Sequence, residues 1–317
     1  MKVAAVRLAL AGALATPAVA NEDAIKAAWL DWLGAGGIGQ SALAITYQGA
    51  VVSVHGSGMS ADRPVPIASL SKAVTGACVL SLIDDSILSY DTTLGEAFSD
   101  RPDLLPAGQS EQAAITVEAL LTHTSGLDFD RTQSVINPVL WGGGDIDDRI
   151  TALALARPLG APVFFYNNEN YAILGRVIAE ATGQPVADVC RARVLDGLTS
   201  AGPDPRNGGA LAWGGWNMTV VDYARFATRL TPQKDWPSTP LNGGAQYGPG
   251  VFVRDTDLGT NIWHFGAFCV LGLNDFGSYF YVLDNGWGVA VWYDVCVSTA
   301  QALALDGGLA RAASSSD

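Results

Sequence analysis

A serine and a lysine three residues apart are the clearest sign of chemistry in this chain. Ser69 and Lys72 precede an apolar run, residues 73–80, that is long enough for a buried helix. Residues three apart on a helix share a face, so the lysine amine can reach the serine hydroxyl. A serine is a weak nucleophile until an adjacent base takes its proton. The spacing therefore predicts a nucleophile and its base. The alternative is that Ser69 caps the helix and Lys72 is solvated.

Two further segments carry groups suited to the same chemistry. Tyr166 and Asn168 lie in an aromatic stretch before a predicted helix, where a phenol beside a cation can relay protons and an amide can orient the lysine or a substrate. His264 and Gly266 lie in a predicted strand, where a glycine often marks close approach of a ligand to the backbone. The N–H just beyond, on Ala267, could donate into an oxyanion hole. Taken singly, these segments also fit a helix cap at Asn168 and a structural histidine.

The order of the three segments resembles the serine β-lactamase and penicillin-binding-protein superfamily, specifically its class C-like branch of β-lactamases, esterases and D-amino-acid peptidases. That branch carries S-x-x-K, then Y-x-N, then K-T-G or H-x-G. The corresponding residues here are Ser69 and Lys72, Tyr166 and Asn168, and His264 and Gly266. Residues 120–127, 170–175, 218–226 and 247–250 extend the likeness, which covers nearly the whole chain after residue 20.

The resemblance implies a catalytic role for three residues. Ser69 would be the nucleophile and Lys72 its general base. Tyr166 would shuttle protons during acylation and deacylation.

The resemblance also implies residues that bind or orient the substrate. Asn168 would be an orienting group, and His264 would line the site opposite Tyr166, beside Gly266. The backbone N–H groups of Ser69 and Ala267 would form the oxyanion hole, the former helped by a helix N-terminus. His123 would be structural, since it falls in a turn segment outside the three motifs.

Two departures from the pattern of this branch bear on the substrate. His264 stands where its efficient β-lactamases carry lysine, and an ordinary histidine is mostly neutral at pH 7. A weaker grip on a substrate carboxylate favours ester or uncharged amide substrates. Tyr166 and His264 are 98 positions apart, which is short for a class C β-lactamase, so we expect substrate-binding loops to be missing. Phe265, with Trp263 and Phe268, is expected to narrow the pocket and to suit an apolar acyl group.

Strand-like segments at both ends of the chain enclose a mostly helical region, in which a glycine run at residues 142–144 is one break. The predicted strands are residues 42–47, 51–55, 251–254, 261–270, 278–283 and 289–297. The predicted helices include residues 24–33, the run after Lys72, residues 171–182 with Gly183 as cap, and residues 299–312. We expect the strands to form one antiparallel sheet flanked by helices.

The predicted fold class is thus α/β of the α+β type, and the resemblance makes it β-lactamase/transpeptidase-like, with an inserted mostly helical region. We expect a signal peptide over residues 1–20 and a single β-lactamase-like catalytic domain over residues 21–317. Its α/β part comprises about residues 21–88 and 231–317, and its helical part about residues 89–230.

The first twenty residues match a secretory signal peptide. Lys2 and Arg7 give a positive start, residues 8–14 are apolar, and residues 18–20 offer a small-residue cleavage site. The apolar run is too short to span a bilayer. We therefore expect a chain that starts near Asn21, no stable membrane insertion, and a periplasmic or secreted protein. An uncleaved membrane anchor is the alternative.

The chain is acidic, with a formal net charge of −13 over 317 residues. This charge disfavours nucleic acid and anionic membranes as partners. The expected partner is a small-molecule or peptide substrate, with cell-wall material as a candidate source. The sequence leaves the oligomeric state open.

Four cysteines in an exported chain permit two disulfides. Cys269 and Cys296 are the preferred pair, because both lie in strand-like runs near the C-terminus. For Cys78 and Cys190, which lie in helix-like runs, a disulfide and two buried thiols are both open. The cysteines and the three histidines show no metal-binding spacing, and we expect neither a metal nor a cofactor.

Together these observations predict a serine hydrolase that forms an acyl-enzyme on Ser69 with a Lys72/Tyr166 proton relay. An esterase-like activity on small or uncharged acyl substrates is preferred. The alternative is a D-alanyl-D-alanine carboxypeptidase, a D-aminopeptidase or a weak class C-type β-lactamase that uses the same residues. A second alternative is a non-catalytic cell-wall-binding or sensor protein that keeps the fold.

Overall fold

The computed structural model describes residues 17–133, 146–257, 259–269 and 275–315. Residues 1–16 of the expected signal peptide, the expected break at residues 142–144 and the last residue of the predicted strand 261–270 lie outside these ranges. The described α-helices are α1 (Pro17–Gly36), α2 (Ser71–Asp84), α3 (Leu94–Ala97), α4 (Ser110–Ala113), α5 (Val117–Leu121), α7 (Ile146–Leu155), α8 (Asn168–Thr182), α9 (Val186–Arg193), α10 (Val220–Ala227) and α11 (Thr299–Ser314). The described strands are β1 (Ser41–Tyr47), β2 (Ala50–Ser57), β3 (Val65–Pro66), β4 (Gly202–Pro203), β5 (Trp216–Met218), β6 (Thr239–Pro240), β7 (Ala245–Tyr247), β8 (Phe252–Thr256), β9 (Gly259–Phe268), β10 (Phe276–Leu283) and β11 (Trp287–Tyr293).

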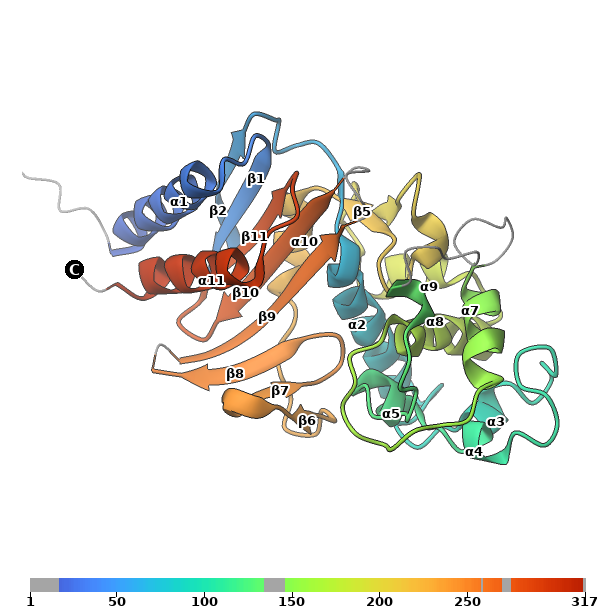
Figure 1. The fold of residues 1–317 in the computed structure, drawn as a ribbon. Helices are drawn as coiled ribbons and strands as arrows, with labels where there is room; N and C mark the ends of the chain where they lie inside the picture. The colour runs from blue at the N-terminus through green and yellow to red at the C-terminus, as the bar shows by residue number, and fades with distance from the viewer. Residues whose placement is uncertain (1–16, 134–145, 258, 270–274, 316–317) are drawn as a thin grey trace, which may run out of the picture.

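The large sheet is assembled from both ends of the chain, as Figure 1 shows. Its strand order is β2-β1-β11-β10-β9-β8-β7-β6, and each neighbouring pair is antiparallel. Strand β1 pairs with β11 along its whole length, from Ser41 opposite Tyr293 to Tyr47 opposite Trp287. The prediction that the strands at the two ends of the chain form one antiparallel sheet, with the helical region inserted between them, is confirmed.

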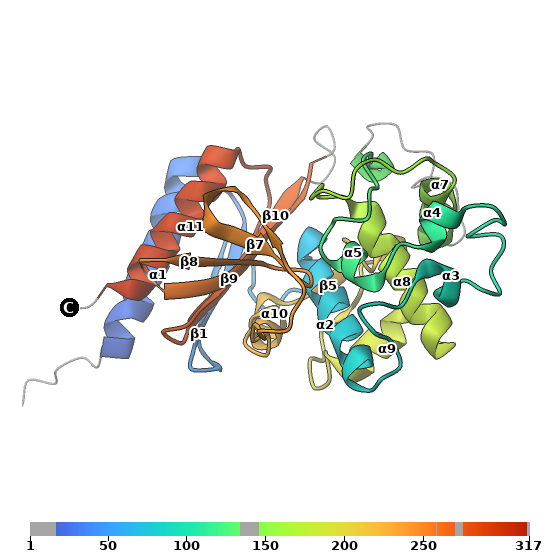
Figure 2. The ribbon, with the colours of Figure 1, turned by 90° about the horizontal axis from the view of Figure 1, so that it is seen from below.

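Helices cover both faces of this sheet (Figure 2). On one face, α1 and α11 lie side by side, and Trp29 and Leu305 from these helices pack with Tyr279 of β10. On the other face, the ring of Tyr223 in α10 packs against that of Phe280, which follows Tyr279 in β10, at 5.3 Å between centroids. Because successive side chains point to opposite faces, a strand covered on both sides is apolar throughout. This accounts for the nearly continuous apolar sequence of β10 and β11.

The inserted helical region lies beyond α2, on the side of the sheet opposite α1 and α11 (Figure 2). Helix α8 packs against α2, α5, α7 and α9. A small antiparallel sheet, β3-β5-β4, pairs Val65 with Met218 and so ties the segment before Ser69 to the strand before α10. Helix α10 precedes residue 230 but packs on the large sheet. The division of the domain near residues 89 and 230 stays a prediction.

The predicted long helices are confirmed, with shifted ends. Helix α8 begins at Asn168, three residues before the predicted start, because the Asn167 side chain caps it by accepting the Glu169 N–H (2.8 Å). It ends, as predicted, at Gly183 in the left-handed conformation (φ 65°). Helix α1 runs through the expected cleavage junction near Asn21. Within the described ranges, no helix combines the length and the apolar character needed to cross a bilayer.

Both possible disulfides are present. Cys269 and Cys296, the preferred pair, join the end of β9 to the loop after β11, with 5.8 Å between Cα atoms. Cys78 and Cys190, for which free thiols were also open, join α2 to α9 with 5.3 Å between Cα atoms. One cross-link therefore lies at the end of the sheet, and the other joins two helices.

A buried carboxylate ties α11 to the sheet. Asp306 accepts two hydrogen bonds from Arg254 Nη2 of β8 (2.5 and 2.6 Å) and one from the Tyr279 hydroxyl of β10. Arg254 also donates to Asn261 Oδ1 of β9 (2.9 Å). A buried charge is tolerated only when it is paired, so these four residues form one interdependent cluster.

Replacing Asp306 with alanine should destabilise the fold, because Arg254 and Tyr279 would lose their acceptor. Arg254 is 22% exposed and water can partly replace the carboxylate, so we expect a loss of about 3 kcal/mol, the low end for a broken buried pair. Urea unfolding measures the loss. The control is Asp103→Ala, which removes the exposed carboxylate of the Arg101–Asp103 ion pair. It should lower the free energy of unfolding much less. Equal losses for the two variants would contradict the cluster.

Candidate active site

Ser69 lies in a short 3-10 turn, η1 (Ala68–Leu70), that leads directly into α2. Ala68 has φ +47°, a left-handed conformation that is strained for a residue with a side chain. The turn is held from two sides: the Ile67 N–H donates to Trp216 O (3.0 Å), and the Ser278 hydroxyl of β10 donates to Ile67 O (2.7 Å). The strained turn thus presents Ser69 at a partly exposed position on a rigid support.

Lys72 is completely buried, so the alternative of a solvated side chain is wrong. Its Nζ donates to the Ser69 hydroxyl (3.1 Å) and to the Trp213 carbonyl (2.9 Å). The Ser69 side chain makes no cap contact to α2, so the capping alternative is also wrong. Burial lowers the pKa of Lys72 to about 7, against the opposing charge of Asp130. A substantial share of Lys72 is therefore neutral near pH 7 and able to accept a proton.

Tyr166 lies next to both members of this pair. The Lys72 amine is 4.9 Å from the centroid of the Tyr166 ring. Burial of the hydroxyl raises the pKa of Tyr166 well above its ordinary value, although a hydrogen bond with Ser69 acts in the opposite direction. Tyr166 is thus a neutral phenol at pH 7, which can donate its proton while it accepts another.

His264 faces Tyr166 from β9. Its Nδ1 is 2.5 Å from the carbonyl oxygen of Phe265, and since a carbonyl only accepts, Nδ1 carries the proton. The Nε2 lone pair then points to the Tyr166 hydroxyl at 3.5 Å. Burial and the nearby Lys72 lower the pKa of His264 to about 3. The residue at this position is therefore an uncharged acceptor at pH 7.

Gly266 is needed because β9 crosses directly over the serine turn. A Cβ added to Gly266 would lie 2.6 Å from the Ile67 carbonyl and 3.1 Å from the Ser69 nitrogen. The close approach expected at this glycine is therefore to the protein's own backbone. Ala267 follows it at an exposed position of the strand, beside the serine turn.

The aromatic residues expected to narrow the pocket lie on two faces of β9. Phe265 stacks on Tyr279 at 4.3 Å between centroids, and Trp263 packs with it under α1 and α11. The expectation was wrong for these two residues, because alternate strand residues face opposite sides of the sheet. Phe268 lies on the same face as His264, stacked on Phe276 at 5.7 Å.

Asn168 contacts a loop of the helical region. Its amide nitrogen donates to Thr132 Oγ1 (2.7 Å), and its backbone N–H donates to the Asp130 carboxylate (2.9 Å). The capping alternative placed the cap one residue late, since Asn167 is the cap of α8. The role of Asn168 toward Lys72 or a substrate stays a prediction.

Two contributors to the site had weak sequence signals. The Trp213 carbonyl binds Lys72, and no side-chain pattern can reveal a backbone acceptor. His123 stands 4.7 Å from Tyr166 between ring centroids, although the turn segment around it suggested only a structural role. Its position within the resembling stretch 120–127 was the available signal.

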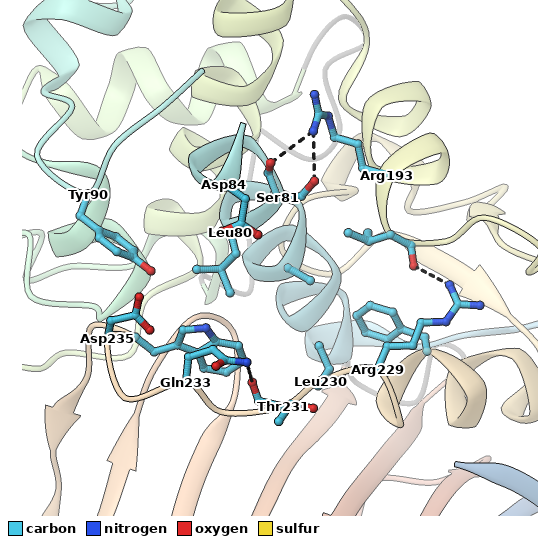
Figure 3. Close-up of a pocket in the computed structure, with 14 residues that line it drawn as sticks. Leu80, Ser81, Asp84, Tyr90, Arg193, Arg229, Leu230, Thr231, Gln233 and Asp235 are labelled. Atoms are coloured by element: carbon cyan, nitrogen blue, oxygen red, sulfur yellow. Dashed lines mark hydrogen bonds between the residues drawn. The ribbon is translucent and has the colours of Figure 1, made fainter. Parts of the chain in front are cut away.

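A pocket of about 530 Å³ opens near the other end of α2, lined by Leu80, Ser81 and Asp84 (Figure 3). Its two guanidinium groups are engaged by the protein: Arg193 donates to Ser81, and Arg229 donates to the Val194 carbonyl. None of the predicted site residues lines it. Over the described residues, no group of three or more His, Cys, Asp or Glu side chains could hold a metal ion.

A protein-family model described as Beta-lactamase matches residues 27–294. Penicillin-binding protein 4 of Amycolatopsis lactamdurans is 29% identical over 147 residues, which are 45% of this chain and 36% of that relative. Esterase EstB of Burkholderia gladioli is 29% identical over 162 residues, which are 48% of this chain and 41% of that relative. The chain thus aligns with less than half the length of these curated relatives.

Solved structures share the fold. D-amino acid amidase from Ochrobactrum anthropi SV3, complexed with L-phenylalanine amide, has a TM-score of 0.71 at 21% identity, over 92% of this chain and 97% of the amidase. SurE with D-Leu has a TM-score of 0.72 at 20% identity, over 93% of this chain and 76% of SurE. The predicted fold class is confirmed.

Replacing Gly266 with alanine should force β9 away from the serine turn. We expect a loss of about 2 kcal/mol in unfolding free energy, as for other overpacked sites, together with slower labelling of Ser69 by a fluorophosphonate. Gly308→Ala is the control, since its added Cβ would meet nothing within 4 Å beyond the neighbouring backbone of its own helix, and alanine favours the helix. Unchanged stability and labelling in Gly266→Ala would rule out the close approach.

Proposed function

Because the chain belongs to the Beta-lactamase family, a family of serine hydrolases, we propose that it hydrolyses acyl substrates through a covalent acyl-enzyme on Ser69. The observation that carries this proposal is the completely buried Lys72 amine, 3.1 Å from the Ser69 hydroxyl and with its pKa lowered to about 7. A lysine in this state can activate a serine, whereas a solvated lysine is protonated at pH 7.

In the acylation step, neutral Lys72 takes the Ser69 proton and the serine oxygen attacks the substrate carbonyl. The backbone N–H groups of Ser69 and Ala267 stabilise the oxyanion. Before the transfer, the Tyr166 hydroxyl donates a hydrogen bond to His264 Nε2. Tyr166 then gives its proton to the leaving oxygen or nitrogen and takes one from Lys72. An alcohol or amine leaves, and the acyl group stays on Ser69.

In the deacylation step, a water molecule replaces the leaving group. Lys72 and Tyr166 take a proton from the water as it attacks the ester of Ser69. The proton returns to the serine oxygen, and the acid is released. In each half-reaction Lys72 and Tyr166 take up one proton and deliver one, so both residues return to their starting protonation states and Ser69 regains its proton from the water.

The substrate proposed first is a small or uncharged acyl ester. With His264 neutral, the site lacks a fixed cation at this position to hold a substrate carboxylate. The likeness to Esterase EstB supports this class. The likeness to Penicillin-binding protein 4 supports a second candidate, hydrolysis of D-alanyl peptides or weak β-lactamase activity by the same residues.

We also propose that the chain is exported to the periplasm or beyond. The signal-like first twenty residues support this, and so do two disulfides, which persist in oxidising compartments. The catalytic unit would then be the single domain from about residue 21 to residue 317.

The nucleophile and the substrate class can be tested together by intact mass. Wild type is exposed to nitrophenyl butyrate, a chromogenic cephalosporin, a D-Ala-D-Ala peptide and a fluorophosphonate. We expect an adduct in wild type and in Ser71→Ala, the matched hydroxyl two positions on, but none in Ser69→Ala. Ester turnover should be the fastest of the three substrates.

Two results would contradict the proposal in different ways. Fast cephalosporin turnover with negligible ester hydrolysis would replace the esterase assignment with β-lactamase activity. If no probe adds mass to Ser69 while Ser69→Ala still binds muropeptide, the chain is a non-catalytic wall-binding or sensor protein.

The pH dependence follows from Lys72. The neutral amine is the active form, so kcat/KM should rise with pH, reach half its plateau near pH 7, and be about 100-fold lower at pH 5. His264 and Tyr166 should not titrate between pH 5 and 9, since the pKa of the former is lowered and that of the latter raised. Lys72→Arg, which stays charged, should lose about 10²–10⁴-fold at every pH. A flat wild-type profile from pH 5 to 8 would exclude Lys72 as the base.

A further inference from the structure

His123 holds an unusual place just after α5. Its side chain is buried and its backbone has φ +57°, a conformation that asparagine and aspartate adopt more readily than most residues. The His123 carbonyl accepts the N–H of Phe165 (2.9 Å), the residue before Tyr166. The strained turn is thus bonded to the segment that carries the proposed proton relay.

The His123 ring is also bonded to the start of α8. Its Nδ1 accepts the Asn167 N–H (3.3 Å) and lies 3.1 Å from the amide nitrogen of Asn170. The Asn170 oxygen is occupied by the Ser125 hydroxyl (2.5 Å), so the nitrogen is the atom that faces the histidine. Two N–H groups pointing at Nδ1 require an unprotonated Nδ1 and a neutral ring. Burial and the nearby Lys72 act in the same direction by lowering the pKa of His123.

The His123 ring packs among the aromatic side chains around the site. Ring centroids lie 4.7 Å away for Tyr166, 4.7 Å for Tyr247 and 5.2 Å for Tyr171. Tyr247 itself is 6.0 Å from Tyr166. A side chain without this ring would leave space beside Tyr166, and its phenol would be free to shift relative to Ser69.

We propose that His123 is a positioning residue for proton transfer at Ser69, a neutral imidazole that anchors the start of α8 through Nδ1 and holds the Tyr166 ring in place by packing against it. The inference rests on the proposed function, because it assigns His123 a role through the Tyr166 relay. Displacement of a relay by a fraction of an ångström slows the reaction more than it weakens substrate binding.

A double-mutant cycle separates this role from general support of the fold. Tyr166→Phe should lower kcat about 100-fold for nitrophenyl butyrate, the scale of a lost proton relay. His123→Phe keeps a ring but loses the acceptor, and should lower kcat by about 10-fold with KM changed less than about 2-fold. The double variant should be no slower than Tyr166→Phe, because a positioning residue has no effect once the group it positions is absent.

A conservative variant tests the acceptor itself. In His123→Asn the amide oxygen can take the place of Nδ1, and asparagine tolerates the positive φ. Because asparagine restores the acceptor but not the ring, we expect kcat to lie between that of His123→Phe and that of wild type, about 3-fold below wild type. His55→Phe is the control, since His55 lies on β2 beside Trp29, 6.5 Å between centroids, and its replacement should leave kcat unchanged. Near-UV circular dichroism and fluorophosphonate titration of Ser69 count the folded protein in each sample.

The outcomes distinguish the inference from the function it rests on. If the effects of His123→Phe and Tyr166→Phe multiply, or if His123→Phe changes KM alone, the positioning role is overturned while the acyl-enzyme stands. If Tyr166→Phe is as fast as wild type, or wild type turns over no ester, peptide or β-lactam, the proposed relay fails and the role of His123 fails with it. If His123→Phe does not fold, the cycle is repeated with His123→Asn. The test is again whether its effect on kcat multiplies with that of Tyr166→Phe.

Discussion

The burial of one lysine amine is the interaction on which the site depends. Lys72 donates hydrogen bonds to a serine hydroxyl and a backbone carbonyl, neither of which carries a charge. A buried ammonium without a full counter-charge is costly, so the proton equilibrium moves toward the neutral amine. Lys72 can act as a base because the fold buries its side chain completely and so lowers its pKa. The loop at Gly250 illustrates the packing, since an added Cβ there would collide with the α2 backbone, 2.7 Å from the Ala73 Cα.

Close contact between two distant parts of the chain is the second constraint. The serine turn belongs to the first third of the sequence, whereas β9 and β10 belong to the last. They meet where Ser278 donates to Ile67, 211 positions away, and where Gly266 leaves room for the turn. The antiparallel sheet built from both ends makes this meeting possible, because β1 from the start of the chain pairs with β11 from its end. The strain at Ala68 is therefore supported from outside the turn, as is usual where a fold holds a reactive group.

Two buried histidines share the surroundings of the lysine. Burial lowers the pKa of both His123 and His264, and the charge of Lys72 lowers it further. Their hydrogen bonds agree with this: Nδ1 of His264 donates to a carbonyl, whereas Nδ1 of His123 accepts from N–H groups. Both rings are therefore neutral, and neither adds a positive charge beside Tyr166. Of these three groups, Lys72 is therefore the one whose protonation changes near pH 7.

Local spacing and periodicity in the sequence determined many of the helices and strands and the first pair of site residues. The three-residue interval from Ser69 to Lys72, the two strands before them, α8 with its Gly183 cap and the C-terminal strands all follow from short-range rules of backbone geometry and burial. The tertiary structure alone decided what depends on contacts between distant residues. These are the depth at which Lys72 is buried, its Trp213 acceptor, and the choice of Asn167 as cap, with Asn168 turned to Thr132. The faces of β9 belong here too, because a sequence shows that Trp263 and Phe265 share one face, but only the packed sheet shows that α1 and α11 cover it.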